Sequence, residues 1–279
     1  MKRLILSAVI AVVPLLAQAQ DRVLPLGGAV TEIVYALGEE GRLVGRDSTA
    51  TWPAAALQLP DVGYVRALSP EGVLSVTPDL IVMEQGAGPA EAIEALRGAG
   101  VKIVTVPDVY TPEGVAQKVR VVADALAVPE KGAALAQKIQ TDIAEARARV
   151  AADTGRKPRV LFILANTGGR LMGSGTATAA DAIITLAGGK NAVSGFTGYK
   201  TLSDEAITTA APDIVLLMER GDGSVQADAI LAHPAMMHTP AGEHGAVVQM
   251  PGLLLLGFGP RTAEAIDTLH KALAARQTQ

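Results

Sequence analysis

The sequence has no cysteine among its 279 residues, which excludes disulfide bonds and a lipid anchor attached through a cysteine thiol. Its four histidines form no pair at the helical spacing of a zinc site with an obvious third ligand. There is also no nucleophile elbow, no Ser/His/Asp set of recognisable spacing and no paired-carboxylate motif. These absences argue against a protein that handles zinc or manganese and against an enzyme.

The one long apolar run stands at the N-terminus. Lys2-Arg3 come first, an apolar run from Leu4 to Leu16 follows, and Ala17-Gln18-Ala19 end it, the order typical of a secretory signal peptide. A membrane-spanning helix needs about 20 apolar residues, and Asp21 comes too early for that alternative. We therefore predict that residues 1–19 are cleaved and that the mature chain lies free in the periplasm, with no direct membrane insertion.

Positive charge is scarce. Removing Lys2 and Arg3 from the 24 basic residues leaves 22, against 28 acidic residues, a net charge of −6 with neutral histidines. A protein that binds nucleic acid needs a basic surface for the phosphates, so the composition argues against such a partner. Aromatic residues make up only 3% of the chain.

Short apolar runs alternate with helical patterns along the rest of the chain, which predicts an α/β fold with parallel sheets. Thr111 is a predicted N-cap and Pro112 the first residue of the helix that runs to Ala127. The predicted strands are Val23–Leu26, Asp79–Met83, Lys102–Val106, Arg159–Ala165, Asp213–Met218 and Val247–Met250.

A single long helix is predicted from Pro129 to about Asp153, because apolar residues recur there at helical spacing and Gly155 follows. At 1.5 Å per residue it would measure roughly 37 Å, the length of a whole lobe. We predict two Rossmann-like α/β lobes with a ligand cleft between them. The predicted boundaries are an N-terminal lobe at 20–128, a connecting helix at 129–154 and a C-terminal lobe at 155–279.

An internal repeat supports two similar lobes, because residues 68–86 are echoed by residues 202–221 and a tyrosine precedes each copy. Met, Glu and Gly follow in both copies after a one-residue insertion. The residues matched at one common offset are Leu68, Ser69, Glu71, Pro78 and Asp79 with Leu202, Ser203, Glu205, Pro212 and Asp213.

Three motifs resemble one family in particular. They are Gly63-Tyr64-Val65-Arg66 with the residues up to Asp79, Glu84-Gln85-Gly86-Ala87-Gly88-Pro89, and Leu256-Gly257-Phe258-Gly259-Pro260-Arg261. With the two lobes and the signal sequence, they resemble the haem-binding branch of the periplasmic substrate-binding proteins that serve ABC importers. The resemblance covers essentially the whole mature chain and implies a protein that binds haem and delivers it to an importer.

With its flanking motif, the resemblance implies that Tyr64 is the axial ligand of the haem iron, and a phenolate is a hard anionic oxygen that suits ferric haem. A free phenol is protonated at neutral pH, so a nearby cation is needed. Arg66 would point to the same side in an extended segment. The alternatives are that Tyr64 is an ordinary loop tyrosine, or that Tyr199 is the ligand; we expect Tyr199 to line the opposite wall.

Haem carries two propionates, which need cations in the cleft. Arg220 follows a predicted strand whose end faces the ligand crevice, so it is the preferred candidate. Arg170, within the glycine-rich loop 167–175, and Arg261 are weaker candidates, with plain surface solvation as the alternative. The glycine-rich loop lacks the lysine of a nucleotide-binding loop, which argues against phosphate binding.

Glu71 and Glu205 occupy matching places in the repeat. The resemblance implies that one exposed glutamate on each lobe docks onto arginines of the transmembrane permease. The alternative is that each glutamate simply suits the positive end of a helix, and both roles are compatible.

Two other functions stay open. A siderophore or corrinoid carrier would use the same scaffold but more cleft aromatics than this chain has. A periplasmic haem chaperone without an importer is the other alternative. A long helical connector also predicts small motion between the lobes.

Overall fold

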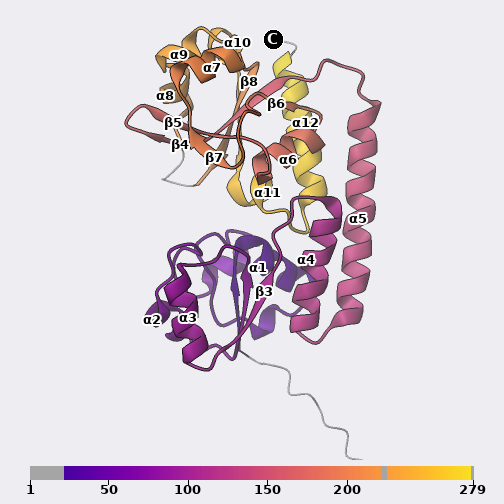
Figure 1. Ribbon diagram of the computed structural model, residues 1–279. Coiled ribbons are helices and arrows are strands. Elements are labelled where there is room, and N and C mark those ends of the chain that lie inside the picture. Colours follow the sequence, from indigo (N-terminus) through magenta and orange to yellow (C-terminus); the bar gives the residue numbers. More distant parts are fainter. Residues whose placement is uncertain (1–21, 221–224, 278–279) are drawn as a thin grey trace, which may run out of the picture.

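The protein, described here by a computed structural model that covers residues 22–220 and 225–277, has two sheets on the same side of one long helix, one beside each end of that helix (Figure 1). The predicted signal peptide at 1–19 lies outside the described residues. The first sheet has three parallel strands in the order β1-β2-β3. Their bounds are β1 Val23–Leu26, β2 Leu80–Glu84 and β3 Lys102–Val106.

Alternating side chains of the central strand β2 serve two different cores. Leu80 and Val82 pack with α1 and α4 on one face, whereas Ile81 and Met83 pack with α2 and α3 on the other. The predicted cap of α4 is confirmed, because the Thr111 hydroxyl accepts a hydrogen bond from the Gly114 N–H at 3.0 Å. The helices of this lobe are α1 Gly28–Ala36, η1 Glu40–Arg42, η2 Ala54–Gln58, α2 Pro70–Leu74, α3 Ala90–Gly98 and α4 Pro112–Ala125.

The second sheet is mixed: the three strands predicted for it from the sequence are parallel, as expected, and two antiparallel strands that were not predicted lie beside them. Strands β4, β8 and β9 are parallel, whereas β5 and β7 run antiparallel in the order β7-β5-β4-β8-β9, with the short β6 beside β4. The strands are β4 Arg159–Thr167, β5 Arg170–Ser174, β6 Lys190–Asn191, β7 Tyr199–Thr201, β8 Ile214–Glu219 and β9 Val247–Pro251.

The predicted glycine-rich loop 167–175 is in fact a hairpin turn followed by strand β5. Gly168 and Gly169 have φ values of 59° and 83°, the left-handed conformation that a two-residue hairpin turn requires. The Asn166 side-chain oxygen accepts a hydrogen bond from the Gly169 N–H at 3.0 Å. The first two glycines therefore serve a tight turn between antiparallel strands.

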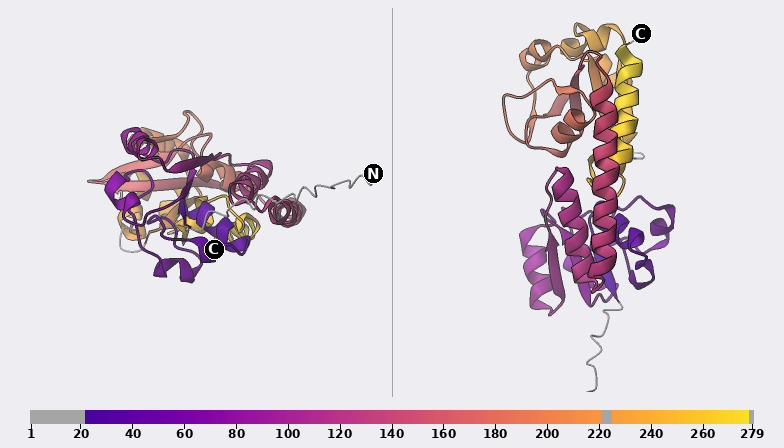
Figure 2. Two further views of the ribbon diagram at one scale, coloured as in Figure 1. Left: turned by 90° about the horizontal axis from the view of Figure 1, so that it is seen from below. Right: turned by 90° about the vertical axis from the view of Figure 1, so that its right-hand side faces the viewer.

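The long connector is α5, Pro129–Ala152, which packs on α4 of the first lobe and on α12 of the second (Figure 2). Buried residues of α1, α5 and α12, such as Ile33, Ile143 and Ile266, belong to one continuous hydrophobic cluster. The lobes therefore share a core on this side. The remaining helices are α6 Ala179–Leu186, α7 Asp204–Ala210, α8 Ala227–Leu231, α9 Pro234–Met237, α10 Pro240–Glu243, α11 Gly252–Leu256 and α12 Thr262–Gln277.

Among the described residues, no helix combines the length and the apolar character needed to cross a bilayer.

Candidate functional site

The carboxyl ends of the first sheet meet the second lobe through a buried charged cluster. Lys118 of α4 is fully buried, and its Nζ lies 2.9 Å from Asp108 Oδ1 and 3.2 Å from the Gly257 carbonyl oxygen of the second lobe. The Tyr110 hydroxyl donates to Asp108 Oδ2 at 2.7 Å. One lysine thus satisfies a carboxylate of its own lobe and a backbone acceptor of the other.

Glu84, at the end of β2, belongs to the same cluster. Burial, followed by the charge of Asp108, raises the pKa of Glu84 to about 7, while Lys118 and Arg66 act in the opposite direction. Burial and the hydrogen bond to Asp108 also raise the pKa of Tyr110. Because two carboxyl groups, Glu84 and Asp108, share the single cation Lys118, the Glu84 carboxyl takes up a proton near neutral pH.

Residues 257–261 of the second lobe lie against the first lobe. The Phe258 ring packs on Tyr110 with centroids 5.3 Å apart, and its backbone φ of 46° is unusual for a bulky residue. Arg261 Nε donates to Glu32 Oε1 of α1 at 3.0 Å, and the guanidinium lies 4.7 Å from the centroid of Trp52. Arg261, predicted to support the ligand, thus forms an ion pair between the lobes.

Tyr64 lies on a turn. The Ala67 N–H donates to the Tyr64 carbonyl at 2.8 Å, and the Gly88 N–H donates to the Val65 carbonyl at 2.9 Å. The Tyr64 side chain is 47% exposed, and its hydroxyl has no hydrogen-bond partner within the described part of the chain. The phenol is therefore accessible to a ligand.

Arg66 follows in the same turn, so its predicted extended geometry was wrong. Val65 is buried in the core between β1 and α3, and the turn hydrogen bond brings the chain round sharply at this point. Arg66 is exposed, and its charge opposes the burial that raises the pKa of Glu84 and the pKa of Tyr199. Arg66 thus acts electrostatically on a residue of each lobe.

Tyr199, the counterpart of Tyr64, lies in the short strand β7 and is 37% exposed. Its ring packs edge-on against Phe162, with centroids 6.4 Å apart. Burial raises the pKa of Tyr199, and hydrogen bonds with Thr178 and the Ala180 backbone act in the opposite direction. Its hydroxyl is therefore engaged at the N-terminus of α6, unlike that of Tyr64.

Two predicted arginines lie at one edge of the second sheet. Arg170 begins β5 opposite Thr167, the last residue of β4, and Arg220 follows the end of β8. Both are exposed. Because β4 and β8 are parallel, both arginines stand at the carboxyl edge of these strands, the edge where ligands bind in open α/β sheets.

The first residues of the two repeat copies adopt the same structure, a helix capped by a serine. Ser69 caps α2 by accepting from the Gly72 N–H at 3.0 Å, and Ser203 caps α7 by accepting from the Ala206 N–H at 3.1 Å. Glu71 and Glu205 are each the second residue after the cap, and both are exposed. Figure 1 shows α2 and α7 on different lobes, both on the side away from α5. Gly221, at the end of the second copy, lies outside the described residues.

No three or more His, Asp or Glu side chains in residues 22–220 and 225–277 are grouped so that they could hold a metal ion.

The chain matches the family described as periplasmic binding protein over residues 23–253. It belongs to that family. The fold of this family has two lobes with a cleft between them, which confirms the predicted architecture. The family consists of binding proteins and not of enzymes, which confirms the prediction of a non-catalytic protein, and its compartment is the periplasm.

Two solved structures are similar over nearly their whole length. One is the "Periplasmic heme-binding protein BhuT in complex with two hemes", with 45% identity, a TM-score of 0.85, and coverage of 91% of this chain and 98% of that one. The other is the "Periplasmic heme-binding protein RhuT from Roseiflexus sp. RS-1 in apo form", with 37% identity, a TM-score of 0.87, and coverage of 92% and 99%. The resemblance predicted from the sequence motifs is thereby confirmed.

A more distant relative has another ligand in its name. The "Vitamin B12-binding protein" of Yersinia pseudotuberculosis serotype O:1b (strain IP 31758) is 25% identical over 76% of this chain and 75% of its own length.

Proposed function

We propose that this protein binds haem between its two lobes in the periplasm and delivers it to an ABC importer. The observation that carries the proposal is the 45% identity, over 91% of the chain, to a protein described as a periplasmic haem-binding protein. The exposed Tyr64 side chain supports this proposal, because its phenol oxygen has no hydrogen-bond partner among the described residues and could bind iron.

The proposed haem site uses residues of both lobes. Tyr64 is the axial ligand of the iron, and Arg66 supplies positive charge beside it. Arg220 is the preferred partner of a propionate, with Arg170 as a second candidate on the same sheet edge. Tyr199 lines the opposite wall with its ring, and Arg261 supports the site through its ion pair with Glu32.

Delivery requires a membrane partner, and Glu71 and Glu205 are proposed to dock on the permease. Their matched positions on capped helices, one on each lobe, suit a partner whose own two halves present arginines. Residues 1–19 are proposed to be a cleaved signal peptide. We also propose the lobes to be 20–128 and 155–279, with residues 129–154 as the connector.

The test of ligation is a titration of the mature protein with hemin, followed by absorption spectroscopy. Wild type is expected to give a ferric-tyrosinate spectrum, and Tyr64→Phe is expected to lose it. Tyr199→Phe is the matched control, because it removes the corresponding phenol of the second lobe and is expected to keep the spectrum. A tyrosinate spectrum that survives in Tyr64→Phe and disappears in Tyr199→Phe would reverse the assignment of the two tyrosines.

Transport separates an importer component from a haem chaperone. Charge reversal at both Glu71 and Glu205 is expected to leave hemin binding unchanged and to abolish growth on hemin as the iron source, since both glutamates are exposed and neither belongs to the proposed haem site. Reversal of the exposed Glu91 and Glu113 is the matched control. Normal growth of the double variant would favour the chaperone.

The second candidate function is corrinoid binding, which the similarity to a vitamin B12-binding protein favours. Titration with cyanocobalamin under the same conditions decides between the two ligands. Saturable binding of the corrinoid in place of hemin would replace haem as the assigned ligand.

A further inference from the structure

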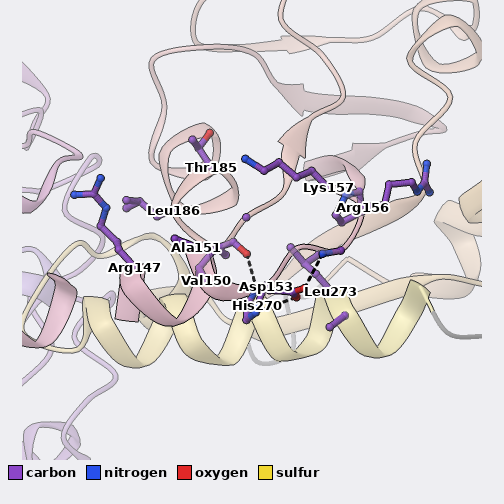
Figure 3. Close-up of a pocket in the computed structure, with 15 residues that line it drawn as sticks. Arg147, Val150, Ala151, Asp153, Arg156, Lys157, Thr185, Leu186, His270 and Leu273 are labelled. Carbon is purple, nitrogen blue, oxygen red and sulfur yellow. Dashed lines mark hydrogen bonds and ion pairs between the residues drawn. The ribbon is translucent and has the colours of Figure 1, made fainter. Parts of the chain in front are cut away.

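An open pocket of about 420 Å³ lies between the end of the connector and the second lobe, away from the residues discussed above (Figure 3). It is lined by the last turns of α5, the segment that follows α5, the end of α6, and α12. Apolar side chains form part of its lining, among them Val150, Leu186 and Leu273. Sites of about 300–1,000 Å³ with an apolar lining and a few polar groups are typical of small organic ligands.

Its charged lining is unbalanced. Arg147, Arg156, Lys157 and His270 line the pocket together with a single acidic residue, Asp153. That carboxylate is already engaged, because it accepts from the Gly155 N–H at 2.8 Å and lies 3.4 Å from His270 Nε2. A basic pocket stands out in a chain whose net charge is −4.

Two of these cations lack an acidic partner, although neighbouring cations have one. Arg149, two residues beyond Arg147 on α5, makes a two-pronged pair with Asp267 at 3.1 and 2.7 Å. Arg156 pairs with Asp213 at 2.7 Å. Within the described part of the chain, Arg147 and Lys157 lie within ion-pair distance of no carboxylate.

The ends of helices α5 and α6 give a competing reason for positive charge here, since a helix C-terminus favours cations. That reason accounts for the charge but not for the pocket with apolar side chains beside it. It also makes a different prediction: substituting the cations would lower stability, whereas a ligand site predicts loss of binding.

We infer that this pocket binds an amphiphilic organic anion, a carboxylate or sulfonate with a short apolar body. The head group would lie on Arg147 or on Lys157, which Figure 3 shows at opposite ends of the lining, and the apolar body would lie against Val150 and Leu273. The inference is independent of the proposed haem site, because no residue is shared between the two.

The test is calorimetric titration of the mature protein with octanesulfonate, whose charge does not change with pH. We expect one molecule per chain to bind with a Kd below about 1 mM, and the double variant Arg147→Glu/Lys157→Glu to bind at least about tenfold more weakly. Ala151→Trp, at an exposed lining position, is expected to weaken binding similarly by filling the space without changing the charge.

The matched control is Lys102→Glu/Arg120→Glu, which reverses two exposed cations of the first lobe and is expected to bind as wild type does. Tyr64→Phe is also expected to bind octanesulfonate normally, which separates this result from failure of the haem proposal. No binding by wild type, or equal binding by the charge-reversed and filled variants, would overturn the inference. If wild type does not bind, a lower thermal midpoint of Arg147→Glu/Lys157→Glu would show that these cations stabilise the helix ends instead.

Discussion

The two copies of the repeat begin alike and end differently. Ser69 and Ser203 cap their helices with nearly equal hydrogen bonds, and each helix leads to a buried strand. At the strand ends, Glu84 lies among Asp108, Lys118 and Arg66, whereas its counterpart Glu219 is exposed. Local sequence was thus retained in both copies where it builds a helix start, while the strand ends acquired different surroundings.

The two tyrosines differ in the same way. Tyr64 lies on a turn with an accessible hydroxyl, whereas the Tyr199 hydroxyl is engaged at the start of α6. Two related positions therefore carry one phenol that is accessible and one that is engaged by its own lobe.

The largest effect on this comparison is expected from Lys118→Met. The change leaves Asp108 buried without its cation and removes the bond to the Gly257 carbonyl, so we expect a loss of about 3–5 kcal/mol in unfolding free energy. Urea denaturation measures it. Lys138→Met, which breaks the exposed pair with Asp142, is the control and should cost less than about 1 kcal/mol. Equal losses of unfolding free energy in the two variants would show that the buried pair at the strand ends of the first lobe contributes no more than an exposed pair.

A smaller effect is expected from Glu84→Gln, and it depends on pH. The pKa of Glu84 is raised from 4.5 to about 7 in the folded protein, so the folded state holds a proton that the unfolded state releases between these values. Stability therefore falls as pH rises from about 4.5 to 7. Glutamine resembles the protonated acid, so the variant is expected to be more stable than wild type at pH 8, by up to about 3 kcal/mol, and similar to it near pH 4.5.

Glu219→Gln is the matched control and should change stability at neither pH, since this side chain is exposed. Urea denaturation at both pH values gives the comparison. Glu32 and Asp47 also have pKa values raised by burial, so part of the slope should persist in Glu84→Gln. If Glu84→Gln kept the full pH dependence of the wild-type unfolding free energy, this role of Glu84 would be contradicted.

The smallest effect is expected from Ser69→Ala and Ser203→Ala. Each removes one N-cap hydrogen bond, so each is expected to cost about 1 kcal/mol, and the two losses should agree within a few tenths. Thermal or urea unfolding of the two single variants tests the equality. A clear difference between them would show that the copies are not equivalent even at their helix starts.

Much of the fold follows from local pattern. The predicted strands lie within two residues of the observed ones, and the Thr111 cap, the long helix and the two glutamate positions follow from residue spacing. Lys118 was missed, although its sequence position gave a signal: it shares the buried face of α4 with Val115 and Val122. A lysine at an apolar position of an amphipathic helix indicates a buried partner.

The prediction failed where a contact joined distant segments. The antiparallel strands β5 and β7 were missed because a glycine pair that forms a hairpin turn was interpreted as a loop. The pairing of Arg261 with Glu32 spans 229 residues, and no local pattern announces it. Arg66 was placed wrongly because burial of the neighbouring Val65 and a turn hydrogen bond set its direction.

The sequence by itself determined the α/β class, the two-lobed plan, the helix starts and the family, because these depend on periodicity, capping residues and short motifs. Only the tertiary structure decided which groups meet: the buried cluster around Lys118, the engaged hydroxyl of Tyr199 and the basic pocket beside α12. The physical reason is that burial and charge pairing arise between segments far apart in the chain. Equivalent residues of the two repeats therefore acquire different properties from different neighbours.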